Sequence, residues 1–229
     1  LPPGHAIAVC EAMIQTGMCN RIRWYAYCSP VPFTAEMAAT FKRAGCAGIN
    51  FGVDSGSDAM LAQLSRCFRT DDIQRTASIC RAHSIPFMFD LLIGAPGETP
   101  QTVCQTLEFV RRLGPDCVGI SLGVRIYPGT PLASQLLAVP HAGMATSHSD
   151  NHQTPETLEP VFYMSPELGT DAHEMIAELV RGDERFFLPE PIGNVPGYNY
   201  NENQPLMDAI RRGARGAYWD ILRRLRKPS

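Results

Sequence analysis

Carboxylate, amide, hydroxyl and guanidinium side chains recur on one face of four strand-like runs, and together they have the chemistry to bind a polar ligand. The runs are residues 21–29, 47–54, 87–93 and 117–126. Successive side chains of a strand point to opposite faces, and in each run one face is apolar while the other is polar or small. The polar face includes Tyr27, Asn50, Asp54, Asp90 and Arg125. A sheet covered on both faces should be apolar on both, so the pattern predicts an open or partial barrel that holds a ligand inside.

A structural interpretation of the two acids stays open beside this one. Asp54 and Asp90 would then be core carboxylates paired with basic neighbours such as Arg23 or Arg125, because buried charges are almost never left unpaired. Such pairing does not exclude ligand binding.

Glycine turns and helix patterns place these runs in a parallel sheet. Three of the runs end in short glycine turns, an amphipathic helix pattern follows the first two, and a shorter one follows the third. Repeated strand–turn–helix units are typical of a parallel α/β sheet, whose active sites lie where the strands end. The sequence predicts helices over 5–16, 34–45, 57–64, 70–83, 99–114 and 131–137. Thr34 and Thr99 are the expected caps of two of them, with Pro100 in the first turn of the second.

Composition divides the chain into three parts. Residues 1–137 carry the α/β pattern, and residues 138–160 are rich in His, Ser, Asn, Pro and Thr, which indicates a linker or loop. Residues 161–229 predict a small, mainly helical extension that ends in one basic amphipathic helix over 206–226. His141, His148, His152 and Asp150 lie in the linker. Because no element would fix their geometry, we predict a surface loop there and no metal site in this chain.

Several classes of function are disfavoured by composition and missing motifs. The net charge is −3, which gives no electrostatic case for nucleic acid, and no apolar run approaches the roughly 20 residues of a membrane span. The eight cysteines include no C-x-x-C pair, so we expect reduced thiols and a cytoplasmic protein. Walker, G-x-G-x-x-G and G-x-S-x-G patterns are lacking. The two lysines, Lys42 and Lys227, lie outside the strands, which excludes strand Schiff-base chemistry.

Three ordered motifs resemble those of radical S-adenosylmethionine (SAM) enzymes. They are FGVDSGS at 51–57 followed by Met60-Leu61, LIGAPGET at 92–99, and IYPGTPL at 126–132. They are similar to the fourth-, fifth- and sixth-strand motifs of the branch that often carries an upstream cobalamin-binding domain and includes the methylthiotransferases. The resemblance covers about residues 1–137.

This resemblance implies a partial TIM-type (βα) barrel that binds SAM over a [4Fe–4S] cluster. Asp54 and Ser55 would face the ribose or amino-acid end of SAM, Gly94 and the Ile126-Tyr127 backbone would flank its adenine, and Tyr27 and Asp90 would line the substrate cavity. Asn50 would share the cofactor face. Arg125 would pair with a carboxylate of SAM or with an anionic substrate, since a guanidinium binds a carboxylate bidentately.

One family feature is missing. The C-x-x-x-C-x-x-C loop that ligates the cluster in this family does not occur in the sequence. We therefore expect the C-terminal part of such an enzyme, inactive alone, with its cluster ligands and any cobalamin domain upstream and with the upstream half of its own barrel as its partner. The substrate would be a small molecule or a modified macromolecule. The alternatives are a metal- or acid/base-dependent barrel lyase or isomerase that uses Asp54 and Asp90, and a non-catalytic binding remnant.

Overall fold

Five parallel strands form the centre of the molecule. The computed structural model describes residues 2–137, 144–146, 161–189, 197, 199–201 and 204–226. The strands follow the order β1-β2-β3-β4-β8, and each neighbouring pair is parallel. Their bounds are β1 (Trp24–Cys28), β2 (Cys46–Asp54), β3 (Phe87–Ile93), β4 (Cys117–Leu122) and β8 (Phe186–Phe187). The predicted α/β fold is confirmed.

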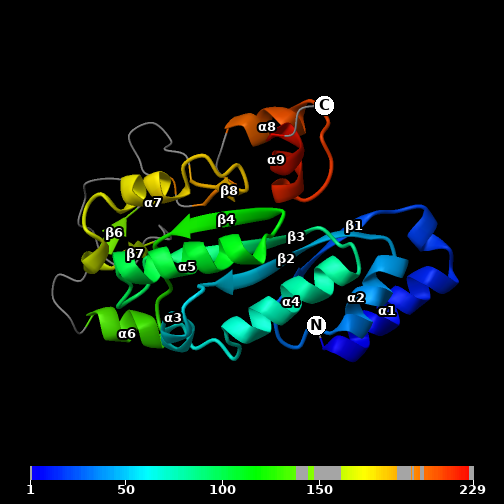
Figure 1. Cartoon of the computed structure of the whole chain (residues 1–229), viewed down its shortest axis with the longest axis horizontal. Helices are drawn as coiled ribbons and strands as arrows, with labels where there is room; N and C mark the ends of the chain where they lie inside the picture. Colours follow the sequence, from blue (N-terminus) through cyan, green and yellow to red (C-terminus); the bar gives the residue numbers. More distant parts are fainter. Residues whose placement is uncertain are drawn as a thin grey trace.

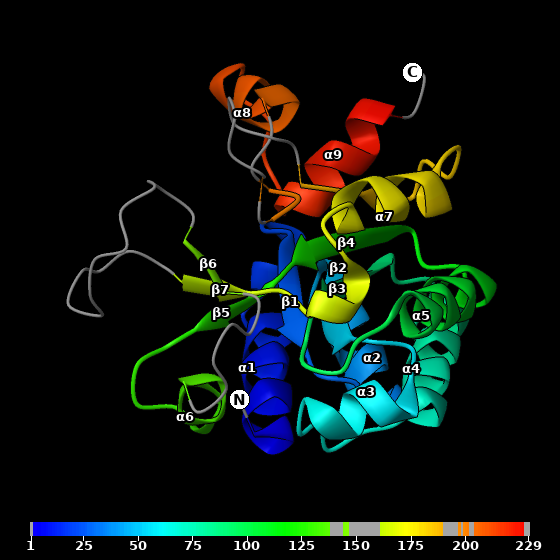
Figure 2. The same ribbon diagram turned by 90° about the vertical axis from the view of Figure 1, so that its left-hand side faces the viewer.

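Helices cover one face of this sheet, which we call the outer face (Figures 1 and 2). They are α1 (Pro3–Gln15), α2 (Ala35–Arg43), α3 (Asp58–Gln63), α4 (Thr70–Ala82) and α5 (Pro100–Leu113). The predicted caps are confirmed: the hydroxyl of Thr34 accepts from the Met37 N–H at 3.2 Å, and that of Thr99 accepts from the Thr102 N–H at 3.2 Å. The apolar strand positions and the helices share one buried core.

The last predicted strand, 117–126, is wrong as a single element. Gly123 breaks it with a left-handed φ of +84°, and its N–H donates to the Ile93 carbonyl at 2.7 Å. The chain therefore leaves the parallel sheet after Leu122. It forms β5 (Val124–Ile126), which pairs antiparallel with β7 (Val161–Tyr163), and β7 pairs with β6 (Met144–Thr146). Figure 2 shows this second sheet projecting beside α6 (Pro131–Leu137).

The C-terminal extension covers part of the opposite face of the parallel sheet, which we call the inner face. The helices on this face are α8 (Gln204–Arg211) and α9 (Tyr218–Arg226), whereas α7 (Ala172–Val180) packs into the core that the outer helices share. The prediction of one helix over 206–226 is wrong, because Gly213 and Gly216 take left-handed φ values of +96° and +127° between α8 and α9. Trp219 of α9 and Tyr200 pack with Met88 and Cys117 in a second buried cluster on this face.

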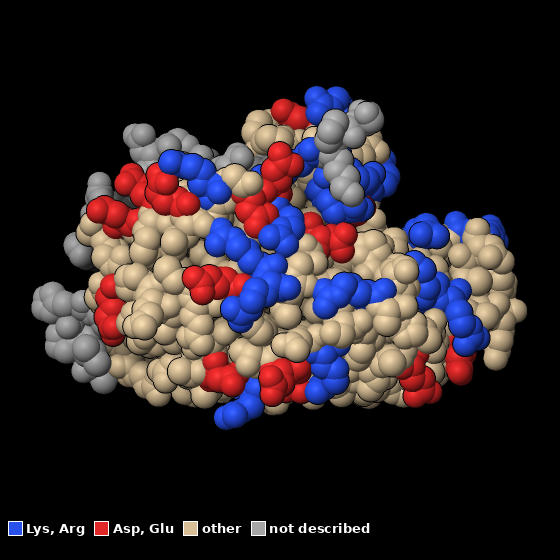
Figure 3. Space-filling model, viewed as in Figure 1, with Lys and Arg blue, Asp and Glu red and all other residues tan. Residues whose placement is uncertain are grey.

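Basic and acidic side chains alternate over the face seen in Figure 3, and the basic ones gather near α8 and α9. On these helices Arg211 pairs with Asp208, and Arg223 and Arg224 pair with Asp220. Within the described part of the chain, no helix has the length and apolar character needed to cross a membrane. The predicted linker, with its three histidines and Asp150, lies outside the described residues except for β6, and the boundaries at 137 and 160 stay predictions.

Candidate functional site

An amide and a carboxyl group form the centre of the inner face. Asn50 lies on β2 and Asp90 on β3, and Nδ2 of Asn50 donates to Oδ2 of Asp90 at 2.6 Å. Asn50 is only 1% exposed. Oδ1 of Asn50 and Oδ1 of Asp90 are both buried without a hydrogen-bond partner. Two buried acceptors are thus left for a molecule that donates hydrogen bonds.

Residues of neighbouring elements surround this Asn50–Asp90 pair. Tyr27 of β1 lies opposite Asn50 in the strand register, and its side chain is exposed. The Tyr200 hydroxyl donates to Sδ of Met88 at 3.6 Å and lies near Asp90. On β4, Ser121 accepts a hydrogen bond of 2.8 Å from Nδ2 of Asn199. The structure therefore brings together three sequence-predicted residues, Tyr27, Asn50 and Asp90, and adds Tyr200 from the segment before α8.

Burial dominates the electrostatics of Asp90. It raises the pKa of the carboxyl group to about 6, the hydrogen bonds from Asn50 and Tyr200 act in the opposite direction, and the charge of Asp54 raises the pKa further. Neither Arg23 nor Arg125 forms an ion pair with Asp90. The structural interpretation of Asp90 as a carboxylate paired with those arginines is therefore wrong.

Open space lies beside the pair. Gly52 is exposed on β2, on the same face as Asn50, and Asp90 is its register partner on β3. A Cβ atom added at Gly52 would meet nothing within 4 Å. Further down the same strand and face, a Cβ at Gly48 would lie 2.7 Å from Trp219. The inner face is thus filled by α9 at the start of β2 and open near its end, where active sites of parallel α/β sheets lie.

The end of β2 carries Asp54 and Ser55 in different environments. Asp54 has a left-handed φ of +59°, and its Oδ2 lies 2.5 Å from Nε of Arg66. Burial raises the pKa of Asp54 and Arg66 opposes this. Ser55 is 1% exposed, and its hydroxyl lies 3.0 Å from that of Thr106 on α5. Ser55 therefore anchors the turn to an outer helix, and its contact with SAM stays a prediction.

A buried carboxyl group closes the turn after β3. Oε2 of Glu98 accepts from the N–H groups of Gly94 at 2.6 Å and Ala95 at 3.2 Å. Burial raises the pKa of Glu98 to about 7. A Cβ at Gly94, whose φ is +110°, would lie 2.5 Å from Sδ of Met164. Glu98 lies in the motif at 92–99, but no role for it was predicted from the sequence. Its position four residues after Gly94 is the feature of the sequence that could have indicated this contact.

The remaining predicted residues lie on the second sheet. Arg125 and Tyr127 are exposed and stack on each other, with the guanidinium 5.0 Å from the ring centroid. Arg125 pairs with Phe162 of β7 in the register of this sheet. It therefore does not belong to the polar row of the parallel strands, which corrects the parity assigned from the sequence. The predicted contacts of Arg125, Ile126 and Tyr127 with SAM stay predictions.

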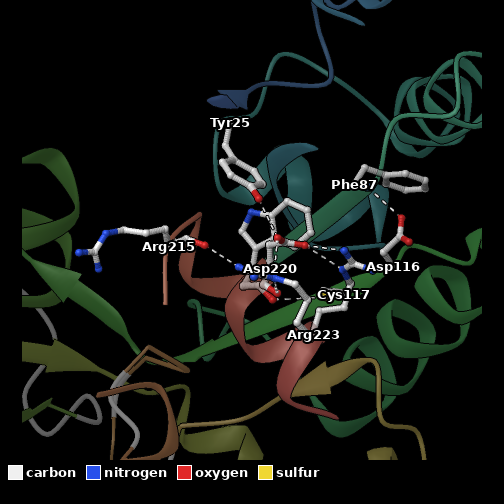
Figure 4. Close-up of polar contacts among 9 residues, drawn as sticks. Tyr25, Phe87, Asp116, Cys117, Arg215, Asp220 and Arg223 are labelled. Atoms are coloured by element: carbon white, nitrogen blue, oxygen red, sulfur yellow. Dashed lines mark hydrogen bonds and ion pairs between the residues drawn. The ribbon is translucent and has the colours of Figure 1, made fainter. Parts of the chain in front are cut away.

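A polar network that the sequence did not reveal anchors α9 beside the site (Figure 4). The Tyr25 hydroxyl on β1 donates to Oδ2 of Asp220 at 2.7 Å, and Arg223 donates to Oδ1 at 2.6 Å. Burial and Asp220 raise the pKa of Tyr25 to about 12. Because 195 residues separate Tyr25 from Asp220, no local pattern could have indicated this contact.

The described residues do not fit an iron–sulfur cluster. Such clusters are held by several cysteine thiolates, and in the part of the chain that the structure describes no three metal-binding side chains gather. All eight cysteines are unpaired, and burial raises the pKa of Cys80 and Cys117 to about 12. The unpaired acceptors of Asn50 and Asp90, in contrast, fit an organic ligand with donor groups.

Known proteins share both sequence and fold with this chain. Residues 5–110 match the family model described as the radical SAM superfamily. Tryptophan 2-C-methyltransferase of Streptomyces laurentii is 34% identical over 121 residues, which are 50% of this chain and 20% of that protein. The threonylcarbamoyladenosine tRNA methylthiotransferase MtaB of Thermotoga maritima is 31% identical over 111 residues, 47% of this chain and 25% of that protein.

The fold is similar to that of a solved methyltransferase over nearly the whole chain. The radical SAM methyltransferase TsrM of Kitasatospora setae, with tryptophan and a SAM analogue bound, superposes with a TM-score of 0.82 at 26% identity, over 96% of this chain and 48% of that one. A second TsrM structure, with cobalamin and a [4Fe–4S] cluster bound, gives 0.80 at 24% identity. The chain thus spans about half of the solved relative and 20–25% of the curated relatives.

These similarities confirm the predicted resemblance and the fold class. The fold built on the five-stranded parallel sheet is similar to that of the solved relative over 96% of this chain. Residues 5–110 of this chain are therefore similar to the radical SAM superfamily, whose family model they match.

Proposed function

We propose that this chain supplies the SAM- and substrate-binding half of a cobalamin-associated radical SAM methyltransferase. The observation that carries the proposal is the similarity to TsrM over 96% of the chain, at a TM-score of 0.82. The unpaired acceptors on the inner face support it, because they leave room for a ligand where the fold places its active site. Sulfur insertion has less support, since the fold similarity over 96% of the chain is to a methyltransferase, while the similarity to MtaB is one of sequence over 47% of the chain.

The ends of β2 and β3 would hold SAM. The Asp54 carboxylate suits the ribose hydroxyls or the amino group, both of which are hydrogen-bond donors. The Gly94 turn, shaped by Glu98, and the backbone of Ile126 and Tyr127 would flank the adenine. Bound SAM would supply the methyl group, and the residues of this chain would orient it and the substrate.

The cluster and the cobalamin would be held by residues outside this sequence. The sequence has no C-x-x-x-C-x-x-C motif, and the described residues form no cluster site. A groove of about 420 Å³ runs between α1 and β1 and is lined mainly by apolar side chains, including Val9, Met13 and Trp24. Among the described strands, β1 pairs only with β2, so this edge suits the upstream half of the same barrel. We keep the cytoplasm as the proposed compartment, since eight free thiols suit a reducing environment.

The substrate would be a small molecule with an aromatic ring, as tryptophan is for the relatives whose names and structures report it. Isothermal titration calorimetry with SAM tests the cofactor half of the proposal. We expect binding by the 229-residue chain and a loss of about 10- to 100-fold for Asp54→Ala, because hydrogen bonds to charged groups are worth about 1.5–3 kcal/mol. Asp71→Ala, on the exposed side of α4, is the control. Unchanged affinity of the Asp54 variant would contradict the assignment.

A further inference from the structure

The Asn50–Asp90 pair presents acceptor atoms in a fixed orientation. Nδ2 of Asn50 is committed to Asp90 at 2.6 Å. Reversing the Asn50 amide would place its oxygen against the carboxylate, so the hydrogen bond also fixes Oδ1 as the group left over. Together with Oδ1 of Asp90 it makes two buried atoms that accept and do not donate. Leaving each acceptor unpaired destabilises the empty site, so a ligand that donates to it is favoured.

The charged and titratable groups around the pair are acidic or phenolic. Asp54 lies near the pair on β2, Tyr27 on β1 and Tyr200 in the segment before α8. Tyr218 of α9 interacts electrostatically with Tyr27. In the described ranges, no basic side chain forms an ion pair with Asp90. Asp54 is itself paired with Arg66, so among the described residues Asp90 is the acid of the site that no cation neutralises, and its charge favours a donor group with positive charge and disfavours anions.

Space for such a group lies directly beside the pair. The open region over Gly52 adjoins Asp90 across the strand register. The Tyr27 side chain, 69% exposed, borders the same region from β1 and offers an aromatic surface. A ligand there would place a polar N–H against the two oxygens and an apolar body against Tyr27.

We propose that Asn50 and Asp90 bind an N–H donor of the methyl-acceptor substrate, either a protonated amine or a ring N–H. The identification of this ligand as the substrate rests on the proposed function, whereas the binding chemistry rests on the two oxygens alone. It moves Asn50 from the predicted cofactor contacts to the substrate contacts. A metal ion does not fit, because the described residues gather no third ligand.

Calorimetry of the 229-residue chain with four probes tests the proposal. Tryptamine and L-tryptophan carry both donors, 1-methyltryptamine carries only the amine, and indole-3-propionate carries only the ring N–H. We expect tryptamine to bind, and Asp90→Asn and Asn50→Leu each to weaken it at least tenfold. Gly52→Val fills the open region without touching the pair and should abolish binding, whereas Glu108→Gln, exposed on α5, should bind as the wild type does.

A second readout separates contact from indirect structural effects. The ¹³C resonance of the Asp90 carboxyl group, assigned by its loss in Asp90→Asn, reports its titration; saturating tryptamine should lower its pKa by at least one unit, because an ammonium partner favours the carboxylate. Binding of only one single-donor probe identifies the donor. The proposal is overturned if no probe binds, or if the variants bind tryptamine as the wild type does. SAM binding is measured separately, with the wild type and Asp54→Ala. If the wild type binds SAM but none of the four probes, only this inference is refuted and the proposed function stands.

Discussion

Replacing Asp90 by Asn should stabilise the protein at neutral and alkaline pH, and the size of the effect follows from burial of the carboxyl group. The folded protein holds the Asp90 proton with a pKa of about 6, against the ordinary value of 3.8 for an aspartate. Well below the unfolded value of 3.8 the group is protonated in both states and costs nothing. Between that value and about pH 6 the unfolded chain loses the proton while the folded protein keeps it, so stability falls by about 3 kcal/mol in all, at 1.36 kcal/mol per pKa unit. Above about pH 6 the folded protein holds a desolvated carboxylate and the loss is complete.

The isosteric Asn keeps an oxygen for the Asn50 N–H and carries no charge. The free energy of unfolding of Asp90→Asn should therefore equal that of the wild type well below pH 4 and exceed it by about 3 kcal/mol at pH 8, in urea titrations at five pH values. Glu108→Gln removes an exposed acid and should show no such trend. A variant less stable than the wild type at pH 8 would mean that Asp90 is a structural carboxylate, and the reasoning would be refuted.

The other predictions concern packing, anchoring and the turn. Gly48→Ala should lower the free energy of unfolding by about 1–3 kcal/mol, because its Cβ would lie 2.7 Å from the indole of Trp219 on α9. Gly52→Ala, on the same strand and face, should change it by no more than about 0.5 kcal/mol. Equal losses in chemical denaturation would contradict this packing. Asp220→Ala should cost about 3 kcal/mol in the same assay, the low end for a broken buried ion pair, because its arginine partners are 22% and 49% exposed. Glu98→Ala should cost about 2–4 kcal/mol by leaving two buried N–H groups unpaired and should weaken SAM binding at least tenfold; intact SAM affinity would show that the turn does not position SAM.

Strand alternation and helix caps were readable from the sequence because they depend on neighbours along the chain. The polar parity of β2 and β3 brought Asn50 and Asp90 together, since parallel strands in register align equal parities. Thr34 and Thr99 were found as caps for the same local reason.

The wrong assignments have two physical origins: a glycine that redirects the chain, and contacts between residues far apart in the sequence. Alternation continued through Gly123, so the pattern could not show that a left-handed φ there turns Arg125 onto another sheet. Partners distant in the chain were equally hidden: Asp54 pairs with Arg66 rather than with a strand arginine. Asp220 meets Tyr25 across 195 residues.

A crystal structure of this chain with L-tryptophan bound would test the central claim most directly. Our account predicts the ligand over Gly52, with a nitrogen within hydrogen-bond distance, about 2.7–3.2 Å, of Oδ1 of Asn50 and Oδ1 of Asp90. An ordered water on those two oxygens, with tryptophan bound elsewhere or absent, would contradict it.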